Sequence, residues 1–192
     1  MIVCAGKNEQ FDFATTLGVG LIQSTLELTK ICLTQHPSEI VFVGSAGAYD
    51  KSLHILDIFL SNEATQIEYS FTQKLSYTPL ENHLKSLATP SQKNINVSYE
   101  TKIINSSNYI HTDSTMAQAM LSKNISLENM EFFAVLQVAQ YFEIPCVGIF
   151  CVSNYCDDNA HKDFCNNHRA VKEKLQSFVG NHFLNQATIK SK

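Results

Sequence analysis

The sequence is poor in arginine and has no excess of positive charge. Of its 14 lysine and arginine residues, only Arg169 is an arginine. Because arginine is the usual bidentate partner of phosphate and carboxylate groups, a site that needs an arginine clamp has a single candidate. The net charge of -4 gives no electrostatic footprint for nucleic acid, so we expect no nucleic-acid partner.

Long apolar runs and paired cysteines are also missing. No stretch approaches the roughly 20 apolar residues that a membrane-spanning helix needs. The first residues lack the charged region and long apolar region of a signal peptide. The six cysteines form no Cys-x-x-Cys pair, which favours reduced thiols. We therefore expect a cytoplasmic protein without membrane association.

The chain has 192 residues, 44% of them hydrophobic, which suits one domain over residues 1–192. Apolar periodicity predicts strands at residues 2–5, 11–16, 40–43, 54–60, 66–71, 94–105 and 146–152. It predicts helices after Gly20, over residues 80–87, from Asp113 to 121, from Asn129, and finally up to about Gly180. This alternation indicates an α/β fold of three layers with a mainly parallel, mixed central sheet.

Polar turns follow two of the predicted strands, and a third opens a helix. Gly44-Ser-Ala-Gly47 follows the strand at residues 40–43, and Ser153-Asn154 ends the strand that begins at Cys146. Asn129-Met-Glu131 lies at the start of a helix. Since ligands of open α/β sheets bind at the carboxyl ends of strands, we expect these turns to share one pocket.

The order and spacing of these three turns resemble the superfamily of purine nucleoside phosphorylases and methylthioadenosine/S-adenosylhomocysteine nucleosidases. The resemblance runs from Gly18 to about Val179. It implies a nucleoside phosphorylase-like fold and a homo-oligomer. It also implies cleavage of the N-glycosidic bond of a purine nucleoside, with phosphate as acceptor and no cofactor.

The resemblance assigns a role to each matched position. It implies that Ser45 and Gly47 lie beside the ribose and the attacking phosphate or water. Glu131 would accept hydrogen bonds from the ribose hydroxyls, with Met130 packed under the ribose. Asn154 would contact purine N7.

Further positions complete the implied site. Tyr109 would stack on the base, and Ile110 would supply backbone hydrogen bonds. Ser153, beside the catalytic candidate Asn154, would contribute to substrate binding.

The chemistry of glycosidic cleavage agrees with these roles. Positive charge develops on the sugar, where a carboxylate is favourable, and negative charge develops on the departing purine. An asparagine at N7 can donate a hydrogen bond but cannot transfer a proton as an aspartic acid can. Asn154 therefore favours 6-oxopurines such as hypoxanthine, because one amide can serve both N7 and O6.

Three departures from the family pattern keep alternatives open. The family's first strand and its acidic loop look absent, so no water-activating acid can be named. No arginine precedes Ser45, and Phe42 stands where phosphorylases have a phosphate ligand. Phe132 and Phe133 stand at the start of a helix where members of the family usually have small residues. Besides phosphorolysis, to which Lys7 or Lys51 could contribute, the sequence allows hydrolysis by water or a catalytically weak nucleoside-binding paralogue.

Simpler interpretations exist for several residues. Glu131 could cap its own helix. Gly18-Val-Gly20, before a helix, could bind an anion or allow close packing. Four residues near the start of the last helix could supply soft metal ligands: Cys156, His161, Cys165 and His168. Their spacing does not match that of structural zinc sites, so we expect no bound metal.

Overall fold

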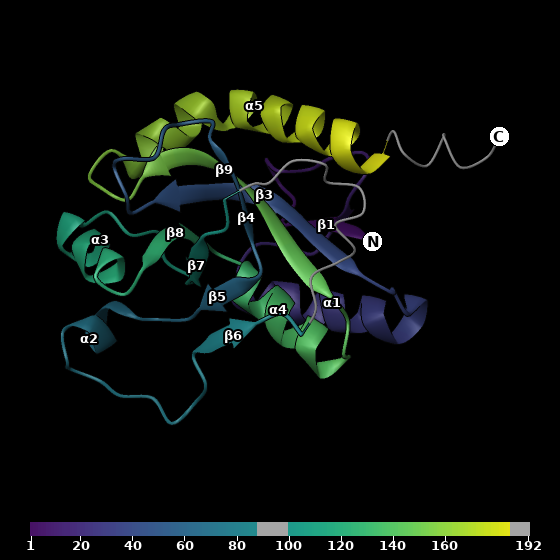
Figure 1. Ribbon diagram of the computed structural model, residues 1–192, viewed down its shortest axis with the longest axis horizontal. Coiled ribbons are helices and arrows are strands. Elements are labelled where there is room, and N and C mark those ends of the chain that lie inside the picture. Colours follow the sequence, from purple (N-terminus) through teal and green to yellow (C-terminus); the bar gives the residue numbers. More distant parts are fainter. Residues whose placement is uncertain (88–99, 185–192) are drawn as a thin grey trace.

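The computed structural model describes residues 1–87 and 100–184. Within them, nine strands form one mixed sheet with helices on both faces (Figure 1). The strands are β1 (Ile2–Cys4), β2 (Thr15–Thr16), β3 (Ile40–Ala48), β4 (Ile58–Ser61), β5 (Glu63–Thr65), β6 (His83–Lys85), β7 (Ile103–Ser106), β8 (Ile125–Asn129) and β9 (Cys146–Tyr155). The helices are α1 (Leu21–Gln35), α2 (Tyr69–Thr72), α3 (Ser114–Leu121), α4 (Phe132–Tyr141), α5 (Ala160–Val179) and the π-helix η2 (Gly180–Leu184). The predicted α/β class with a mixed, mainly parallel sheet is confirmed.

Strand β3 lies at the centre of this sheet. It pairs in parallel with β1 and with β9, and its last residues pair antiparallel with β8. The sheet continues from β8 through β7 and β5 to β6, while β4 pairs with the outer edge of β9. The carboxyl end of β3 is thus flanked by two strands, each of which brings polar residues to the same edge.

Alternating side chains of the central strands face two different helix layers. Val41 and Val43 pack with Val171 and Leu175 of α5 on one face. Phe42 and its even-numbered neighbours pack with α1 and α4 on the other. Figure 1 shows α5 along one side of the sheet and α1 and α4 along the opposite side. Because strand side chains alternate, one continuous apolar run supplies both cores.

The bulky Phe132 is accommodated by an aromatic cluster in the α1/α4 layer. Its ring centroid lies 5.1 Å from that of Phe150 and 5.9 Å from that of Phe42. Gly148 makes room, since an added Cβ there would lie 2.2 Å from Phe150 and 2.9 Å from Phe132. The phenylalanines that depart from the family pattern therefore have a structural explanation in the core.

The predicted helices after Gly20, from Asp113 and up to Gly180 are confirmed. Helix α1 has 15 residues and ends at Gln35, followed by the C-cap residue His36, which has a left-handed φ of 45°. The side chain of Asp113 caps α3 by accepting a hydrogen bond from Thr115 N at 2.8 Å. Helix α4 begins at Phe132, three residues after the predicted start at Asn129.

Three predicted elements are wrong, wholly or in part. They are the strands at residues 54–60 and 66–71 and the helix at residues 80–87. Strand β4 begins only at Ile58, because Leu56 has a φ of 73°. The backbone of Ile67 bonds to the Asn105 side chain instead of a neighbouring strand, and α2 follows. Residues 83–85 form β6, in which Leu84 alone is buried, so a two-residue period replaces the expected helical one.

Three further differences concern short or hidden strands. Only Thr15–Thr16 of the predicted strand at residues 11–16 is extended in the sheet, while Phe11 stacks on Phe13 with 5.1 Å between ring centroids. Strand β8 was not predicted. Of the predicted strand at residues 94–105, residues 94–99 lie outside the described residues, and β7 begins at Ile103.

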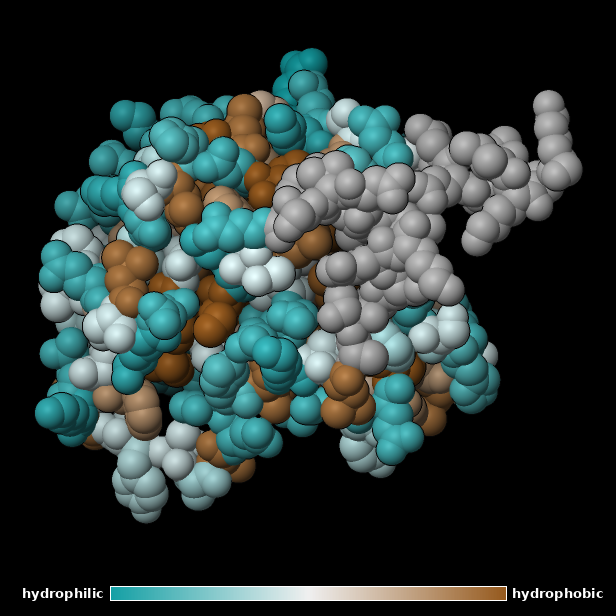
Figure 2. All heavy atoms as spheres, viewed as in Figure 1, coloured by the Kyte–Doolittle hydropathy of each residue, from teal (hydrophilic) through white to brown (hydrophobic). Residues whose placement is uncertain are grey.

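The molecular surface mixes hydrophilic and hydrophobic residues. On the face shown in Figure 2, apolar residues appear in small groups between hydrophilic ones. Three apolar residues of α1 that fit the helical period are exposed rather than buried: Ile22 at 72%, Leu26 at 62% and Leu33 at 59%. No helix in the described part of the chain has the length and apolar character to cross a bilayer.

Candidate active site

A cavity of about 280 Å³ lies at the carboxyl ends of β3, β8 and β9. The structure brings all eight site residues implied by the family resemblance to its wall. These are Ser45, Gly47, Tyr109, Ile110, Met130, Glu131, Ser153 and Asn154. The predicted convergence of the three polar turns is therefore observed.

The Glu131 carboxylate is buried and held by three N–H donors. Its Oε1 accepts from Gly20 N at 3.0 Å, and its Oε2 accepts from Asn129 Nδ2 at 3.0 Å and from Met130 N at 3.2 Å. It makes no capping hydrogen bond to α4; Asn129 Oδ1 does so by accepting from Phe132 N at 3.1 Å. Glu131 thus occupies the N-cap position of α4, as the simpler interpretation expects, but its carboxylate makes its hydrogen bonds elsewhere.

The Gly18-Val-Gly20 segment presents the N-terminus of α1 to that carboxylate. Gly18 and Gly20 have φ values of +94° and +89°, which favour glycine. Leu21 N donates to Asn108 Oδ1 at 2.9 Å, beside the Gly20 bond to Glu131. The segment does meet an anion at a helix N-terminus, but this anion is a side chain of the protein itself.

The Asn154 amide has a defined orientation. Its Oδ1 accepts from Ser153 Oγ at 2.7 Å, and its Nδ2 donates to Tyr155 O at 3.1 Å. Ser153 Oγ also lies 3.2 Å from Ala46 O, and Asn167 Nδ2 donates to Ser153 O at 2.9 Å. Since Ser153 fixes the amide oxygen and one N–H donates to Tyr155 O, the second Nδ2–H is the donor that Asn154 can offer to a ligand.

Gly47 occupies the space between two polar side chains. In the sheet it pairs with Glu128 of β8 on one side and with Asn154 of β9 on the other. An added Cβ would lie 3.0 Å from Asn154 Nδ2 and 3.2 Å from Glu128 Cγ. The glycine therefore lets both side chains reach the same part of the cavity.

Glu9 is a cavity residue that the sequence analysis missed. It lies in the turn after β1, and its carboxylate accepts hydrogen bonds from Ser45 Oγ and, at 3.3 Å, from Ser45 N. The expectation that no acidic loop follows a first strand is therefore wrong. The signal was present, because Glu9 follows the end of a predicted strand, where ligand-binding residues gather.

Burial raises the pKa of two carboxyls of the cavity, Glu9 and Glu131. It raises the pKa of Glu9, against which the hydrogen bonds from Ser45 act. Burial, with a smaller contribution from the nearby Glu9 carboxylate, raises the pKa of Glu131 to about 8. Glu9 and Glu131 thus face a common space, in which one of them can hold a proton near neutral pH.

The other predicted residues form the mouth and floor of the cavity. Tyr109 and Ile110 line it while remaining 75% and 53% exposed. Met130 is half-buried next to Glu131. From α5, His161 and Phe164 complete the wall. The cavity wall thus combines aromatic and apolar side chains with the polar groups at the strand ends.

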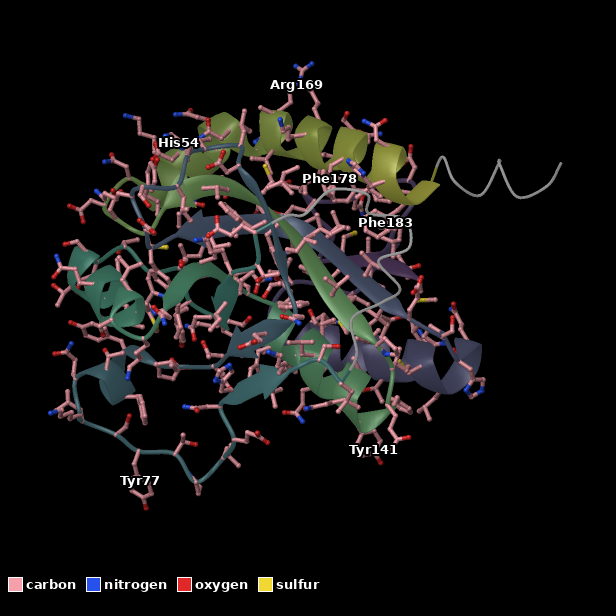
Figure 3. All side chains as sticks on the ribbon, in the orientation of Figure 1. His54, Tyr77, Tyr141, Arg169, Phe178 and Phe183 are labelled. Atoms are coloured by element: carbon pink, nitrogen blue, oxygen red, sulfur yellow. The ribbon has the colours of Figure 1, made fainter. Side chains whose placement is uncertain are left out.

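The cations proposed for an anion clamp lie mostly elsewhere. Arg169 points away from the sheet on α5 (Figure 3) and binds Glu173 at 3.0 Å. Lys51 binds Asp157 at 3.0 Å. Among the described residues that line the cavity, Lys7 is the one lysine, and no arginine is present.

The alternative set of metal ligands is dispersed. Cys165 Sγ lies 3.6 Å from His161 Nε2 on exposed helix α5, whereas Cys156 is buried behind Gly47. His168 Nδ1 contacts the Cys165 backbone carbonyl. In residues 1–87 and 100–184, no three His, Cys, Asp or Glu side chains are grouped to hold a metal ion.

The family model described as "Phosphorylase superfamily" matches residues 3–183. The chain belongs to this superfamily. This superfamily member is 27% identical over 150 residues to a 5'-methylthioadenosine/S-adenosylhomocysteine nucleosidase of Halalkalibacterium halodurans, covering 71% of this chain and 64% of that protein. It is 24% identical to the aminodeoxyfutalosine nucleosidase of Helicobacter pylori, covering 76% of this chain and 68% of that protein.

Solved structures show the same fold for this superfamily member. A variant of the Helicobacter pylori nucleosidase with 5'-methylthioadenosine in its active site has a TM-score of 0.78 at 18% identity, covering 100% of this chain and 97% of that one. A mutant of the futalosine hydrolase of Helicobacter pylori has a TM-score of 0.79 at 18% identity, covering 94% of this chain and 96% of that one. At this identity the likeness establishes the fold alone.

Proposed function

We propose that this superfamily member hydrolyses the N-glycosidic bond of a purine nucleoside, with water as acceptor. The observation that carries the proposal is the Glu9–Ser45 hydrogen bond inside the cavity that Glu131 and Asn154 also line. The nucleosidase names of the relatives support it. Hydrolysis, one of the alternatives left open by the sequence, thus fits better than phosphorolysis.

Each residue has a defined part in the reaction. Glu9 takes a proton from a water molecule held beside Ser45, and the water oxygen bonds to the anomeric carbon of the ribose. The bond from that carbon to the purine nitrogen breaks, and its electron pair leaves with the base. Asn154 donates a hydrogen bond that stabilises the departing base, which then takes a proton from solvent.

Glu131 and Met130 would hold the ribose. A buried carboxylate accepts hydrogen bonds from vicinal hydroxyls and favours the positive charge that develops on the sugar. Tyr109 and Ile110 would cover the base from the open side of the cavity. These assignments follow the positions of the side chains around one space.

Water suits this cavity better than phosphate does. A phosphate dianion needs cationic partners, and usually an arginine or several N–H donors. Here the position beside Ser45 is occupied by the carboxylate of Glu9, which would repel a phosphate. A carboxylate is, however, the group needed to remove a proton from water.

The test is turnover of inosine, adenosine and 5'-methylthioadenosine by the purified protein, with and without phosphate. Release of free sugar without any need for phosphate supports the proposal. Formation of a sugar 1-phosphate would show phosphorolysis instead. Binding without product would show the non-enzymatic paralogue, and both of these outcomes overturn the proposal.

Glu9→Gln should reduce the hydrolysis rate by about 100-fold or more, the usual contribution of a general base. Asp12→Asn is the matched control, because Asp12 is an exposed carboxylate near Glu9 that does not line the cavity. A Glu9→Gln protein as active as the Asp12→Asn protein would exclude Glu9 as the base.

We also propose that the chain forms a homo-oligomer in the cytoplasm. The exposed apolar residues Ile22, Leu26 and Leu33 of α1 support association with a second copy, since monomers rarely expose such a row. The six free cysteines support a reducing compartment. Light scattering of the wild type and of Leu26→Glu tests the assembly: a monomeric wild type would contradict it.

A further inference from the structure

Two residues at the mouth of the cavity belong to an irregular segment. Tyr109 and Ile110, which together form the loop tip, line the cavity although both are largely exposed. They lie between β7 and α3, where residues 107–113 form no helix or strand. Such connecting segments are more mobile than the elements they join unless other contacts hold them. The contacts on either side of the loop tip therefore decide whether it stays over the cavity.

Both ends of this segment are tied to consecutive residues of β8. Before the loop tip, Ser107 N donates a hydrogen bond to Asn129 O at 3.2 Å. After the loop tip, His111 N donates to Oε1 of Glu128 at 3.1 Å. Residues 107–111 thus form a loop that is closed on the carboxyl end of β8, and the loop tip extends from this closed base over the cavity.

Different elements hold the two sides of the loop tip. On the first side, Asn108 Oδ1 accepts a hydrogen bond from Leu21 N at the start of α1, at 2.9 Å. On the second side, the Glu128 carboxylate holds His111 twice. Its Oε1 accepts from the backbone nitrogen, and its Oε2 pairs with His111 Nδ1 at 2.5 Å. Two bonds to one residue fix its backbone and its ring together, so His111 cannot turn without breaking one of them.

The pair of Glu128 and His111 is shielded from water and is itself supported. The two side chains are 7% and 11% exposed. Burial lowers the pKa of His111, but the hydrogen bond to Glu128 and the charge of that carboxylate outweigh it and raise the pKa. The protonated ring is therefore favoured, which makes the bond charge-assisted. Tyr49 OH also donates to Oε2 of Glu128 at 2.7 Å, so the carboxylate that holds the loop is fixed from a third direction.

We propose that Glu128 is a positioning residue, which keeps the loop tip over the cavity by holding both the backbone and the side chain of His111. This inference rests on the proposed function, in which the loop tip covers the base of the nucleoside. Glu128 and His111 take no part in the breaking of the glycosidic bond. Loss of their contact should therefore weaken the binding of the nucleoside and leave the chemical step nearly unchanged.

The first test compares His111→Ala with the wild type, using initial rates with the nucleoside that the wild type cleaves. The variant loses the side-chain bond to Glu128, and His111 itself is not among the residues that line the cavity. KM should rise by about tenfold, the effect of one lost charge-assisted hydrogen bond, while kcat should change by less than about threefold. An unchanged KM, or a fall in kcat as large as the rise in KM, would overturn the inference.

His111→Asn tests whether the hydrogen bond, rather than the size of the imidazole ring, holds the loop. An asparagine side chain can place its Nδ2 close to the position of the histidine Nδ1 and can donate to the Glu128 carboxylate from there. This variant should recover most of the wild-type KM. A KM as high as that of His111→Ala would overturn the inference.

Ser61→Ala is the matched control for a general loss of stability. It removes a buried hydroxyl that donates to Glu63 O at 2.7 Å, and Ser61 lies in β4, outside the cavity wall. The free energy of unfolding should fall, whereas KM should stay at the wild-type value. A rise in KM as large as that of His111→Ala would show that KM follows stability alone, which would also overturn the inference.

A fluorescent probe separates this inference from the proposed function, because it requires no turnover. The chain contains no tryptophan, so Tyr109→Trp places a single one at the loop tip. Adding His111→Ala to this variant should lower the steady-state fluorescence anisotropy of the tryptophan, since the loop tip then moves more freely. Adding Ser61→Ala should leave the anisotropy unchanged. A lower anisotropy with His111→Ala supports the inference even if no nucleoside is cleaved, and an unchanged one overturns it even if hydrolysis is observed.

Discussion

The backbone nitrogen of Gly20 donates a 3.0 Å hydrogen bond to Oε1 of Glu131, a residue 111 positions later in the chain. This bond connects the N-terminus of α1 with the carboxylate proposed to hold the ribose. The partial positive charge of the helix end and two further N–H donors favour the ionised form of Glu131. Burial acts in the opposite direction and dominates, raising the pKa to about 8.

This balance predicts a pH-dependent stability. Since the pKa of Glu131 is about 8 in the folded protein and near 4.5 when unfolded, the folded state binds the proton more tightly. The contribution of Glu131 to the free energy of unfolding is therefore greatest below the unfolded pKa and is lost as the pH rises towards 8. We expect the stability of the wild type relative to Glu131→Gln to fall between about pH 5 and about pH 8.5.

Urea unfolding of both proteins across that range measures the difference. Glu81→Gln, at an exposed position, serves as the control and should show no such trend. A difference between wild type and Glu131→Gln that is flat or increases with pH would contradict the buried, proton-binding state of Glu131.

Ser45→Ala should shift the pH dependence of the hydrolysis rate. The hydrogen bonds from Ser45 lower the pKa of Glu9, so loss of the hydroxyl should raise it. A general base works only when deprotonated. The rise in kcat with pH should thus occur at higher pH in the variant, as measured with initial rates over a series of buffers. The same profile in Ser45→Ala and in the exposed control Ser122→Ala would argue against the pairing.

Gly47→Ala should reduce catalytic activity more strongly than it reduces the stability of the folded protein. The added methyl group would lie 3.0 Å from Asn154 Nδ2 and 3.1 Å from Cys156 Sγ, so these side chains would have to move. We expect kcat/KM to fall by about tenfold or more and the free energy of unfolding to fall by about 1–3 kcal/mol. Gly180→Ala is the control, since no atom lies within 4 Å of its added Cβ. Equal activity of the two variants would show that the space above Gly47 is not used.

Phe132→Ala should lower the free energy of unfolding by about 3–5 kcal/mol, because it leaves a cavity between Phe42 and Phe150. Tyr141→Ala provides a comparison on the same helix. Tyr141 is 81% exposed and points outwards at the end of α4 (Figure 3), so its removal should change stability by less than about 0.5 kcal/mol. Chemical denaturation measures both, and similar losses would contradict the assigned packing.

Several features of the site were predictable because they depend on local patterns. Gly44 to Gly47 and Ser153-Asn154 follow continuous apolar runs, and buried strands that end in polar residues place them at a ligand edge. The helical period also gave the extent of α1, although it could not tell which of its apolar residues are buried. Leu28 is fully buried while Leu26 is exposed, because the partner surface comes from α4.

Local sequence patterns were sufficient for the α/β class, the superfamily resemblance and the polar turns that line the cavity. The hydrogen bonds between Glu9 and Ser45 and between Gly20 and Glu131, and the positions of Glu128 and Asn154 on either side of Gly47, follow only from the folded chain. The difference lies in the range of the interactions. Apolar periodicity reflects neighbours a few residues apart, whereas these contacts depend on strand register and on the packing of segments far apart in the chain.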